Sequence, residues 1–392
     1  MGRLASRALL VLVGLALGVL AIEVGLRLAG PNIPLDLTMA RFQVYHPVYG
    51  FFHRPGVSGW LRTREFTSYV KFNSQGLRGP EAAVPKPAEL FRVLVLGDSV
   101  VEGAQVAYEE TIAARLAANL AQLGVAAQLE TINAGVAGFG TGQELLFLQT
   151  DGARLQPDLV VLVFTVANDV ADNGVAVARR WKLAAERRPF FVSGRDGELR
   201  ELPFKAPPSE PFEGIRSFLR DRSVLFNVLE LWAVGKGVAR AHESVVPPLD
   251  AEKEVYLREP GDDWQQAWDA TERLLAKLDQ VATESGVPLV IVLSPTQLQT
   301  YDKQWREHMA GLTARAERRL SPEAPNERLA EIARRRGLRM LDLLPVFRAE
   351  AAADSPPLFF RQDGHWTEQG HALAAREVAT HLVESGLVRT GR

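Results

Sequence analysis

The stretch FRVLVLGDS, residues 91–99, decides how this chain folds. Its apolar run is typical of a strand that is buried on both faces, and Gly97 ends it. The pattern that follows predicts a helix over Glu109 to Ala121. A serine at such a strand-to-helix turn can meet free backbone N–H groups, which suit a negative charge that develops on oxygen. Because Gly, Asp and Ser also favour ordinary turns and helix caps, the motif alone leaves both interpretations open.

The region around this motif alternates strands with helices. The predicted strands are Arg92–Leu96, Leu129–Asn133, Leu159–Thr165, Leu289–Leu293 and Arg339–Asp342. The predicted helices are Glu109–Ala121, Gln143–Arg154, Trp264–Glu284, Asn326–Arg336 and Glu368–Glu384. This alternation predicts an α/β fold with a doubly wound parallel sheet. Such a sheet binds ligands at the carboxyl ends of its strands, where Ser99 stands.

The composition excludes several classes of site. The chain has 392 residues, 47% of them apolar, so it can bury a large core. Its formal net charge of −2 gives no sign of a nucleic-acid partner. It has no cysteine, which excludes disulfides, thiol nucleophiles and cysteine-based metal sites.

The N-terminus predicts a membrane anchor. Arg3 and Arg7 precede an uninterrupted apolar run from Ala8 to Ile22, and mostly apolar residues continue to Ala29. The whole stretch of 22 residues reaches the length of a membrane span, and no small-residue cleavage site precedes a polar start. We therefore favour an uncleaved signal-anchor at residues 1–30 over a cleaved signal peptide. Since positive charge precedes the run, we expect a single-pass protein of the inner membrane whose main domain is periplasmic or extracellular.

Two segments lie outside the alternating pattern. Residues 31–90 are rich in aromatic residues, Pro and Gly, and predict a small β-rich, membrane-proximal segment ahead of the main domain, residues 91–392. A long insertion at about residues 170–263 follows the third predicted strand. Within it, residues 187–199 are expected to form a hairpin that turns at residues 195–197. The insertion can line a substrate cleft or only extend the scaffold.

Further candidate site residues follow the predicted strands. The loop NAGVAGFGTG at residues 133–142 contains Gly138. Its glycines let backbone N–H groups approach a ligand, although a flexible loop also explains them. Asn168 follows the third strand, where its amide can donate to an oxyanion or simply form a turn.

Asp363 and His365 stand just before the last predicted helix. An imidazole exchanges protons near neutral pH, so His365 is a candidate base, and Asp363 is close enough in sequence to orient it. The pair can also ligate a metal, but no third ligand has convincing spacing, and we expect neither a metal nor a cofactor. His371 and His381 follow at helical spacing and are expected to be solvated.

In this order, the motifs resemble those of the SGNH (GDSL-type) hydrolase superfamily, over about residues 91–387. The resemblance implies a flavodoxin-like parallel sheet of five strands, with Ser99 as the nucleophile and His365 as its base. It also implies an oxyanion hole made of the Ser99 N–H, the Gly138 N–H and the Asn168 side chain.

The sequence departs from the family pattern at two positions. Val100 replaces the usual Leu after the serine. Most esterase members carry the acid three residues before the histidine, where this chain has Gln362, so Asp363 is the candidate acid. An Asp-x-His-Trp arrangement is similar to that of membrane-associated members, which include relatives of alginate O-acetyltransferases. The anchor and the stretch NSQGLR at residues 73–78 also resemble the layout of membrane-anchored bacterial SGNH proteins.

The resemblance implies a serine esterase of the cell envelope that hydrolyses O-acyl ester bonds through an acyl-Ser99 intermediate. One alternative is an O-acyltransferase that acts on an envelope polysaccharide. An alternative of another class is a non-catalytic envelope protein that binds a glycan or a partner. The expected partners are an O-acylated small molecule or glycan and the bacterial membrane. Four tryptophans can line an acceptor groove, pack in the core or face the membrane: Trp60, Trp181, Trp305 and Trp366.

Overall fold

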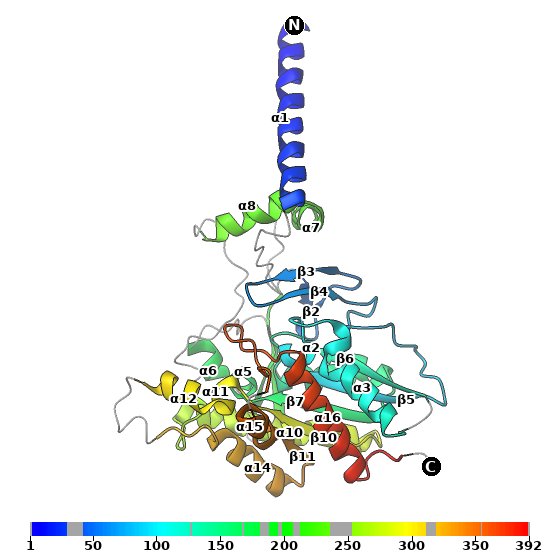
Figure 1. Cartoon of the computed structure of the whole chain (residues 1–392), viewed down its shortest axis with the longest axis vertical. Helices are drawn as coiled ribbons and strands as arrows, with labels where there is room; N and C mark the ends of the chain where they lie inside the picture. The colour runs from blue at the N-terminus through cyan, green and yellow to red at the C-terminus, as the bar shows by residue number, and fades with distance from the viewer. Residues whose placement is uncertain are drawn as a thin grey trace.

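The computed structural model describes residues 2–29, 42–125, 128–166, 168–180, 188–194, 198–206, 212–235, 253–310, 319–353 and 355–390. Its main domain is built around one five-stranded sheet with helices against both faces (Figure 1). A single helix, α1 (Gly2–Ala29), projects from this domain (Figure 1).

The sheet has the strand order β11-β10-β7-β5-β6, and all neighbouring strands are parallel. The strands are β5 (Phe91–Gly97), β6 (Leu129–Gly135), β7 (Leu159–Thr165), β10 (Leu289–Ser294) and β11 (Met340–Asp342). Each predicted strand overlaps an observed one, so the expected α/β class with a doubly wound, five-stranded parallel sheet is confirmed.

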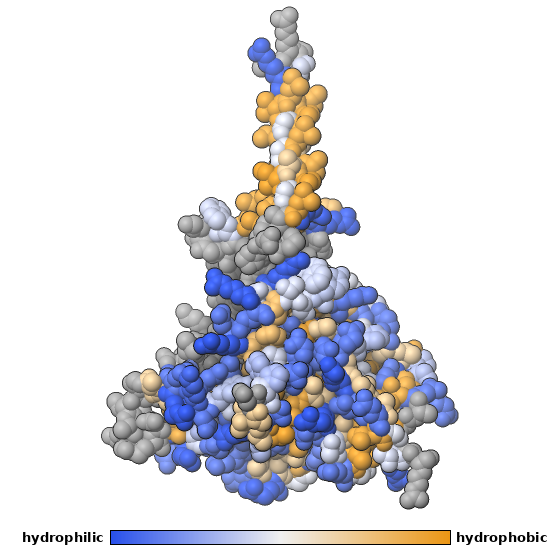
Figure 2. All heavy atoms as spheres, viewed as in Figure 1, coloured by the Kyte–Doolittle hydropathy of each residue, from blue (hydrophilic) through white to orange (hydrophobic). Residues whose placement is uncertain are grey.

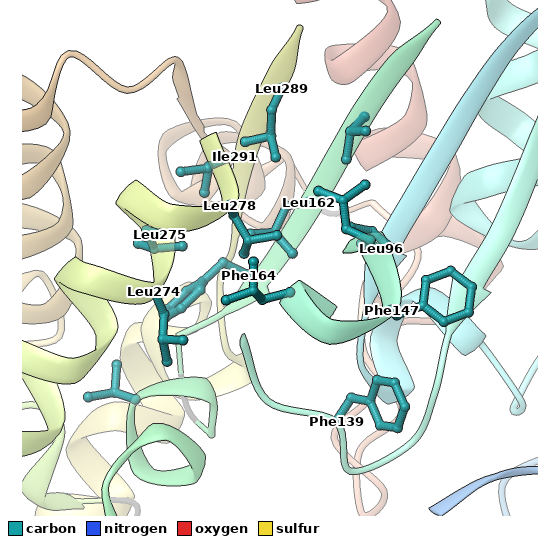
Figure 3. Packing of buried hydrophobic residues seen from close by; sticks show 14 of the residues in the cluster. Leu96, Phe139, Phe147, Leu162, Phe164, Leu274, Leu275, Leu278, Leu289 and Ile291 are labelled. Atoms are coloured by element: carbon teal, nitrogen blue, oxygen red, sulfur yellow. The ribbon is translucent and has the colours of Figure 1, made fainter. Parts of the chain in front are cut away.

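Side chains along each strand alternate between two apolar cores, one on each face of the sheet. In β5, Val93 and Val95 face one core, whereas Leu94 and Leu96 face the other. The helices over the first core are α3 (Ile112–Gln122), α15 (Leu344–Ala352) and α16 (Glu368–Glu384). Those over the second core are α4 (Thr141–Phe147), α10 (Asp262–Glu284) and α14 (Ala324–Arg336). Figure 3 shows the second core, where leucines of α10 pack against β7 and β10.

The strand order creates a topological switch point beside β5. The chain passes from β5 to β6 at one edge, then returns across the sheet to β7 on the other side of β5. Since parallel crossovers are right-handed, the helices after β5 and after β6 lie on opposite faces. Sheets of this topology bind ligands at the carboxyl ends of the two strands that flank the switch point, which here are β5 and β7.

Side-chain caps fix where several helices begin. Asp98 caps the short helix α2 (Ser99–Glu102), Thr111 caps α3 and Thr367 caps α16, each by accepting a hydrogen bond from a backbone N–H of the first turn. The helix predicted over 143–154 is interrupted: α4 gives way to a π-helical turn, Leu148–Gly152. Short helices complete the connections: η3 (Tyr108–Glu110), α11 (Gln297–Thr300) and α12 (Asp302–Met309).

The segment before the sheet contains two antiparallel ribbons. One pairs β1 (Gln43–His46) with β2 (Gly50–His53), and the other pairs β3 (Ser58–Arg62) with β4 (Thr67–Lys71). The side chains of β4 alternate between exposed and buried, which is typical of a half-buried strand. Figure 1 shows these ribbons between α1 and the sheet.

The insertion after β7 contains short helices and one ribbon. Its described elements are α5 (Asp169–Asn173), α6 (Val175–Arg180), β8 (Phe190–Ser193), β9 (Leu199–Leu202), α7 (Glu213–Arg222) and α8 (Val224–Gly235). The pairing of β8 with β9 confirms the predicted hairpin, while its turn at 195–197 lies outside the described residues.

Helix α1 has the composition of a membrane span. Its stretch Ser6–Leu28 is long and apolar enough to cross a membrane, and none of it is buried within the protein. Figure 2 shows the apolar surface of α1 beside a largely hydrophilic domain. The helix is therefore compatible with the expected anchor.

Candidate active site

Ser99 is the first residue of α2, directly after β5. The Asp98 carboxylate accepts a hydrogen bond from Val100 N at 2.9 Å and so fixes the start of this helix. A side chain at Gly97 would collide with Val101, so only glycine lets α2 turn this closely onto the sheet. The Gly-Asp-Ser turn thus places a partly exposed Ser99 at the carboxyl end of the central strand.

Ser99 meets a histidine that lies 266 residues later in the chain. His365 Nε2 is 2.8 Å from Ser99 Oγ, and His365 Nδ1 is 2.7 Å from Asp363 Oδ1. The three side chains form a continuous path from carboxylate to imidazole to hydroxyl. Such a path can move the hydroxyl proton to the imidazole, while the carboxylate stabilises the cation that forms.

The loop that carries Asp363 and His365 is held by an acidic residue from the β3–β4 ribbon. Glu65 Oε2 accepts hydrogen bonds from Gln362 N and Asp363 N, both at 2.8 Å. Gly364 has a φ of +82°, a backbone conformation that favours glycine. The carboxylate that reaches the imidazole is therefore that of Asp363, two residues before His365.

Nearby charges raise the pKa of His365. Burial lowers this pKa, but the Asp363 hydrogen bond and charge, with the charges of Asp98 and Glu102, outweigh burial and bring it above the ordinary 6.5. Burial raises the pKa of Asp363, yet its contacts with His365 and a hydrogen bond from Gln105 bring it below the ordinary 3.8. An ionised carboxylate beside a more basic imidazole suits general-base chemistry.

Two of the predicted oxyanion donors are backbone N–H groups, those of Ser99 and Gly138. Within the described ranges, Ser99 N and Gly138 N have no hydrogen-bond acceptor. The Gly138 loop is held from both sides: Ala137 N donates to Glu102 Oε2 at 2.6 Å, and the Gly138 carbonyl accepts from Arg188 Nη2 at 2.8 Å. These contacts make the glycine loop a fixed part of the site rather than a loose connection.

The Asn168 amide lies at the same edge of the sheet but already has acceptors. Its Nδ2 donates to Asp98 Oδ2 at 2.8 Å. Burial raises the pKa of Asp172, and a hydrogen bond with the Asn168 side chain is among the contacts that oppose this shift. An oxyanion that binds here must therefore compete with carboxylates for the amide.

Buried charged residues behind the site were not identified from the sequence. The fully buried Glu102 carboxylate lies 3.0 Å from His53 Nε2, in addition to its bond with Ala137. Arg78, which is 2% exposed, donates to the carbonyl oxygens of Glu102 and, at 2.6 Å, Val106. Arg78 lies in the NSQGLR stretch, whose resemblance to other SGNH proteins could have marked it as a candidate. Glu102 and His53 come from distant segments, and no local sequence pattern marks either residue.

The expectation that His371 is solvated is wrong. It is 1% exposed, and its Nδ1 accepts a hydrogen bond from Ile112 N at 3.2 Å. Burial, with the charges of Arg78 and His365, lowers the pKa of His371 to about 3, so the ring is neutral at physiological pH. His371 is buried because α16 packs against α3, so that this face of α16 points towards the core. His381 is partly exposed.

The tryptophans differ in their surroundings. Trp366 is 1% exposed and packs on Phe347, so it belongs to the core. Trp60 is exposed, Trp305 is partly buried, and Trp181 lies outside the described residues. Among the described residues, no three His, Asp or Glu side chains form a group able to hold a metal ion.

Comparisons with known proteins connect this fold to a family. Residues 252–391 match the model of the family described as "SGNH hydrolase-like domain, acetyltransferase AlgX". The matched part includes Asp363 and His365 but not Ser99. This match confirms the resemblance to SGNH hydrolases for residues 252–391. The sheet topology agrees with the fold that the resemblance implies.

Solved structures of hydrolases are similar over most of the chain, at low identity. A lipase/acylhydrolase from Enterococcus faecalis is 12% identical, with 77% of this chain and 99% of that chain covered and a TM-score of 0.37. The acetyl xylan esterase AlAXEase is 12% identical, with coverages of 75% and 100% and a TM-score of 0.39. The acetyl-xylooligosaccharide esterase Axe2 from Geobacillus stearothermophilus, as a mutant, is 13% identical, with coverages of 74% and 94% and a TM-score of 0.39. A comparison with curated protein sequences gave no match.

Proposed function

We propose that this chain is an envelope-anchored serine esterase that hydrolyses O-acyl ester bonds. The observation that carries the proposal is the contact of Ser99 Oγ with His365 Nε2 at 2.8 Å, backed by Asp363. A protein that used this fold only to bind a glycan or a partner would have no need for that alignment. The catalytic function is therefore favoured over the binding one.

The proposed reaction has two halves. His365 takes the proton of Ser99 Oγ as this oxygen attacks the ester carbonyl, and the oxyanion is held by Ser99 N and Gly138 N. The imidazolium then gives its proton to the leaving alkoxide, so an acyl-Ser99 ester and a free alcohol result. Water, deprotonated by His365, attacks the acyl group in the second half, and Ser99 regains its proton.

The access of water to the site favours hydrolysis of the acyl-Ser99 intermediate over transfer of its acyl group to another acceptor. The side chains of His365 and Asp363 keep 28% and 25% of their surfaces exposed. An acyl group on Ser99 is then within reach of solvent, whereas a transferase has to keep water away from it. Asp363 and His365 are also reachable by a polymeric substrate such as an O-acylated glycan.

A second candidate is an O-acyltransferase that passes the acyl group to a sugar hydroxyl. It is favoured by the family match, whose description names an acetyltransferase. The chemistry of Ser99 is the same up to the acyl-enzyme, and only the acceptor differs.

We also propose that α1 anchors the protein in the inner membrane as a single-pass helix, with the main domain in the periplasm or outside the cell. The apolar, unburied run from Ala8 to Ile22 within the stretch Ser6–Leu28 supports this placement.

The experiment that tests the function measures where the acyl group goes. The full chain in nanodiscs is given p-nitrophenyl acetate, with and without an acetyl-free oligosaccharide, and both released acetate and acetylated sugar are quantified. The esterase proposal predicts acetate as the main product under both conditions. Acetylated sugar that replaces acetate would favour the transferase, and the absence of ester cleavage would contradict both.

A further inference from the structure

Two helices of the insertion, α7 and α8, lie at the end of α1 (Figure 1). These helices and Phe212, the residue that precedes α7, expose large apolar side chains that a water-facing domain normally buries. The exposed fractions are 75% for Phe212, 59% for Ile215, 54% for Phe218, 53% for Leu229 and 60% for Trp232. The sequence of α8, VLFNVLELWAVG, has one charged residue in twelve. This apolar surface is the feature to explain.

Helix α8 is fastened to α1 by a carboxylate. Glu23 accepts hydrogen bonds from Ser223 Oγ, Val224 N and Leu225 N, each at 2.9 Å. The N–H groups of Val224 and Leu225 belong to the first turn of α8 and have no partner within the helix, so Glu23 acts as a cap from another segment of the chain. Arg27 binds Glu23 Oε1 at 2.7 Å and also donates to a carbonyl oxygen at the end of α7.

The two helices are also fastened to each other. Arg216 of α7 pairs with Glu230 of α8, with 2.9 Å between Nη2 and Oε1. The Arg222 guanidinium lies 4.8 Å from the centre of the Phe218 ring. Apolar rings with guanidinium groups beside them are typical of helices that lie at the boundary between lipid headgroups and acyl chains.

We propose that α7 and α8 lie in the interface of the membrane that α1 spans and insert their exposed apolar side chains between its headgroups. This inference rests on the proposed anchoring by α1. Glu23 and Arg27 are the charged residues at the domain-facing end of the span, so they place the headgroups at this level of α1. Because Glu23 caps α8, α8 begins at that same level, and Figure 1 shows it running across the axis of α1 rather than along it.

Lipid is the occupant that these observations favour over a second copy of the chain. The apolar surface of α1 is unburied throughout its span and needs lipid around it. Glu23 and Arg27 of α1 hold the start of α8 and the end of α7 at the end of that surface. In our proposal, the bilayer that surrounds α1 therefore also covers the exposed residues of α7 and α8, without any further partner. The insertion then gives the main domain a second contact with the membrane.

The absence of cysteine makes a direct test possible. Single variants Phe218→Cys and Leu229→Cys of the full chain are labelled with an environment-sensitive fluorophore in nanodiscs. Quenching is compared between nitroxide lipids labelled near the headgroup and aqueous iodide. Leu15→Cys in the span and Leu123→Cys, an exposed position at the far end of α3, are the matched controls.

The inference predicts several-fold stronger quenching by nitroxide lipid than by iodide at 218 and 229, with the reverse at 123. Iodide quenching at 218 and 229 while position 15 is quenched by lipid would overturn the inference and leave the anchor intact. Shielding of position 229 from both quenchers, with disulfide cross-links between unlabelled Leu229→Cys chains, would show that a second copy covers the surface and would also overturn it. Iodide quenching at position 15 would overturn the anchor and the inference together, without any effect on the proposed esterase chemistry.

Discussion

The groups proposed to activate Ser99 and the groups proposed to bind the oxyanion differ in how far they are already arranged for catalysis. On one side, His365 and Asp363 are already aligned, with contacts of 2.8 and 2.7 Å. On the other side, Ser99 N and Gly138 N are free, but the Asn168 amide is bound to Asp98. In the proposed mechanism, the acid–base half is therefore complete before a substrate arrives, whereas the oxyanion half has to redirect the Asn168 amide, one of its three expected donors.

The difference has a structural origin. Asp363 and His365 come from one short loop that Glu65 holds by its backbone, so their contact is largely local. The proposed oxyanion side depends on three carboxylates from separate segments: Asp98 in the turn after β5, Glu102 of α2 and Asp172 of the insertion. Only the complete fold brings these segments together. The acid–base half is thus expected to dominate the measured effects of substitution.

The largest effect is expected for Ser99→Ala. Loss of the nucleophile of a serine hydrolase costs about 10⁶-fold in turnover, so ester cleavage should fall to background. Labelling by a fluorophosphonate probe should disappear as well. Ser285→Ala, at the exposed end of α10, is the control that should keep both. Labelling that persists in Ser99→Ala would point to a different nucleophile.

Asp363→Asn should have the next largest effect, a loss of up to about 10⁴-fold in turnover. The reason is that a neutral amide cannot stabilise the imidazolium as the Asp363 carboxylate does. The base form of His365 is neutral, so activity falls as the pH drops below its raised pKa. Removal of the carboxylate removes the main cause of that raised pKa. The acid limb of the kcat/KM profile should therefore move to lower pH.

Gln362→Ala is the matched control for this variant. Gln362 occupies the place of the acid in most related esterases, yet the structure gives it only a backbone contact with Glu65 near the site. Activity and pH profile should stay close to those of the parent chain. A Gln362→Ala variant as damaged as Asp363→Asn would show that the loop, rather than the carboxylate, is what matters.

Asn168→Ala tests whether the Asn168 amide takes part in binding the oxyanion. If the amide leaves its carboxylate and reaches the oxyanion, its loss should lower kcat by about 100- to 1000-fold, the usual cost of one oxyanion donor. Thermal melting checks that the fold is retained. A loss below about tenfold would restrict Asn168 to holding Asp98 and would leave a two-donor oxyanion hole.

Glu102 is expected to have the smallest effect of the four. Glu102→Gln keeps an oxygen that can accept from Ala137 N, so the Gly138 loop should stay in place and kcat should fall by less than about tenfold. Glu102→Ala frees that N–H and should cost more, towards the 100-fold of a misplaced oxyanion donor. Equal kcat values for the two variants would mean that Glu102 does not position this loop.

Much of the fold could be predicted from the sequence because its signals are local. The continuous apolar runs of β7 and β10 mark strands that are buried on both faces, and the turn after β5 marks the end of the central strand. The order of the motifs along the chain also predicts Ser99, Asp363 and His365 as candidate site residues.

The remainder depends on contacts between distant segments. The pairing of His53 with Glu102 and the bond between Asn168 and Asp98 join segments 49 and 70 residues apart. No pattern in either segment encodes such a pairing. The prediction that His371 is solvated was wrong for a related reason. Helical spacing does not show which face of α16 packs against α3.

The most direct test of the account is to trap the acyl-enzyme. The full chain is mixed with p-nitrophenyl acetate, quenched in acid during the first turnovers and digested, and the peptides are analysed by mass spectrometry. The account predicts an acetyl group on Ser99 that is absent from the Ser99→Ala variant. An acetyl group on another side chain, or continued ester cleavage with Ser99 unmodified at every time point, would contradict it.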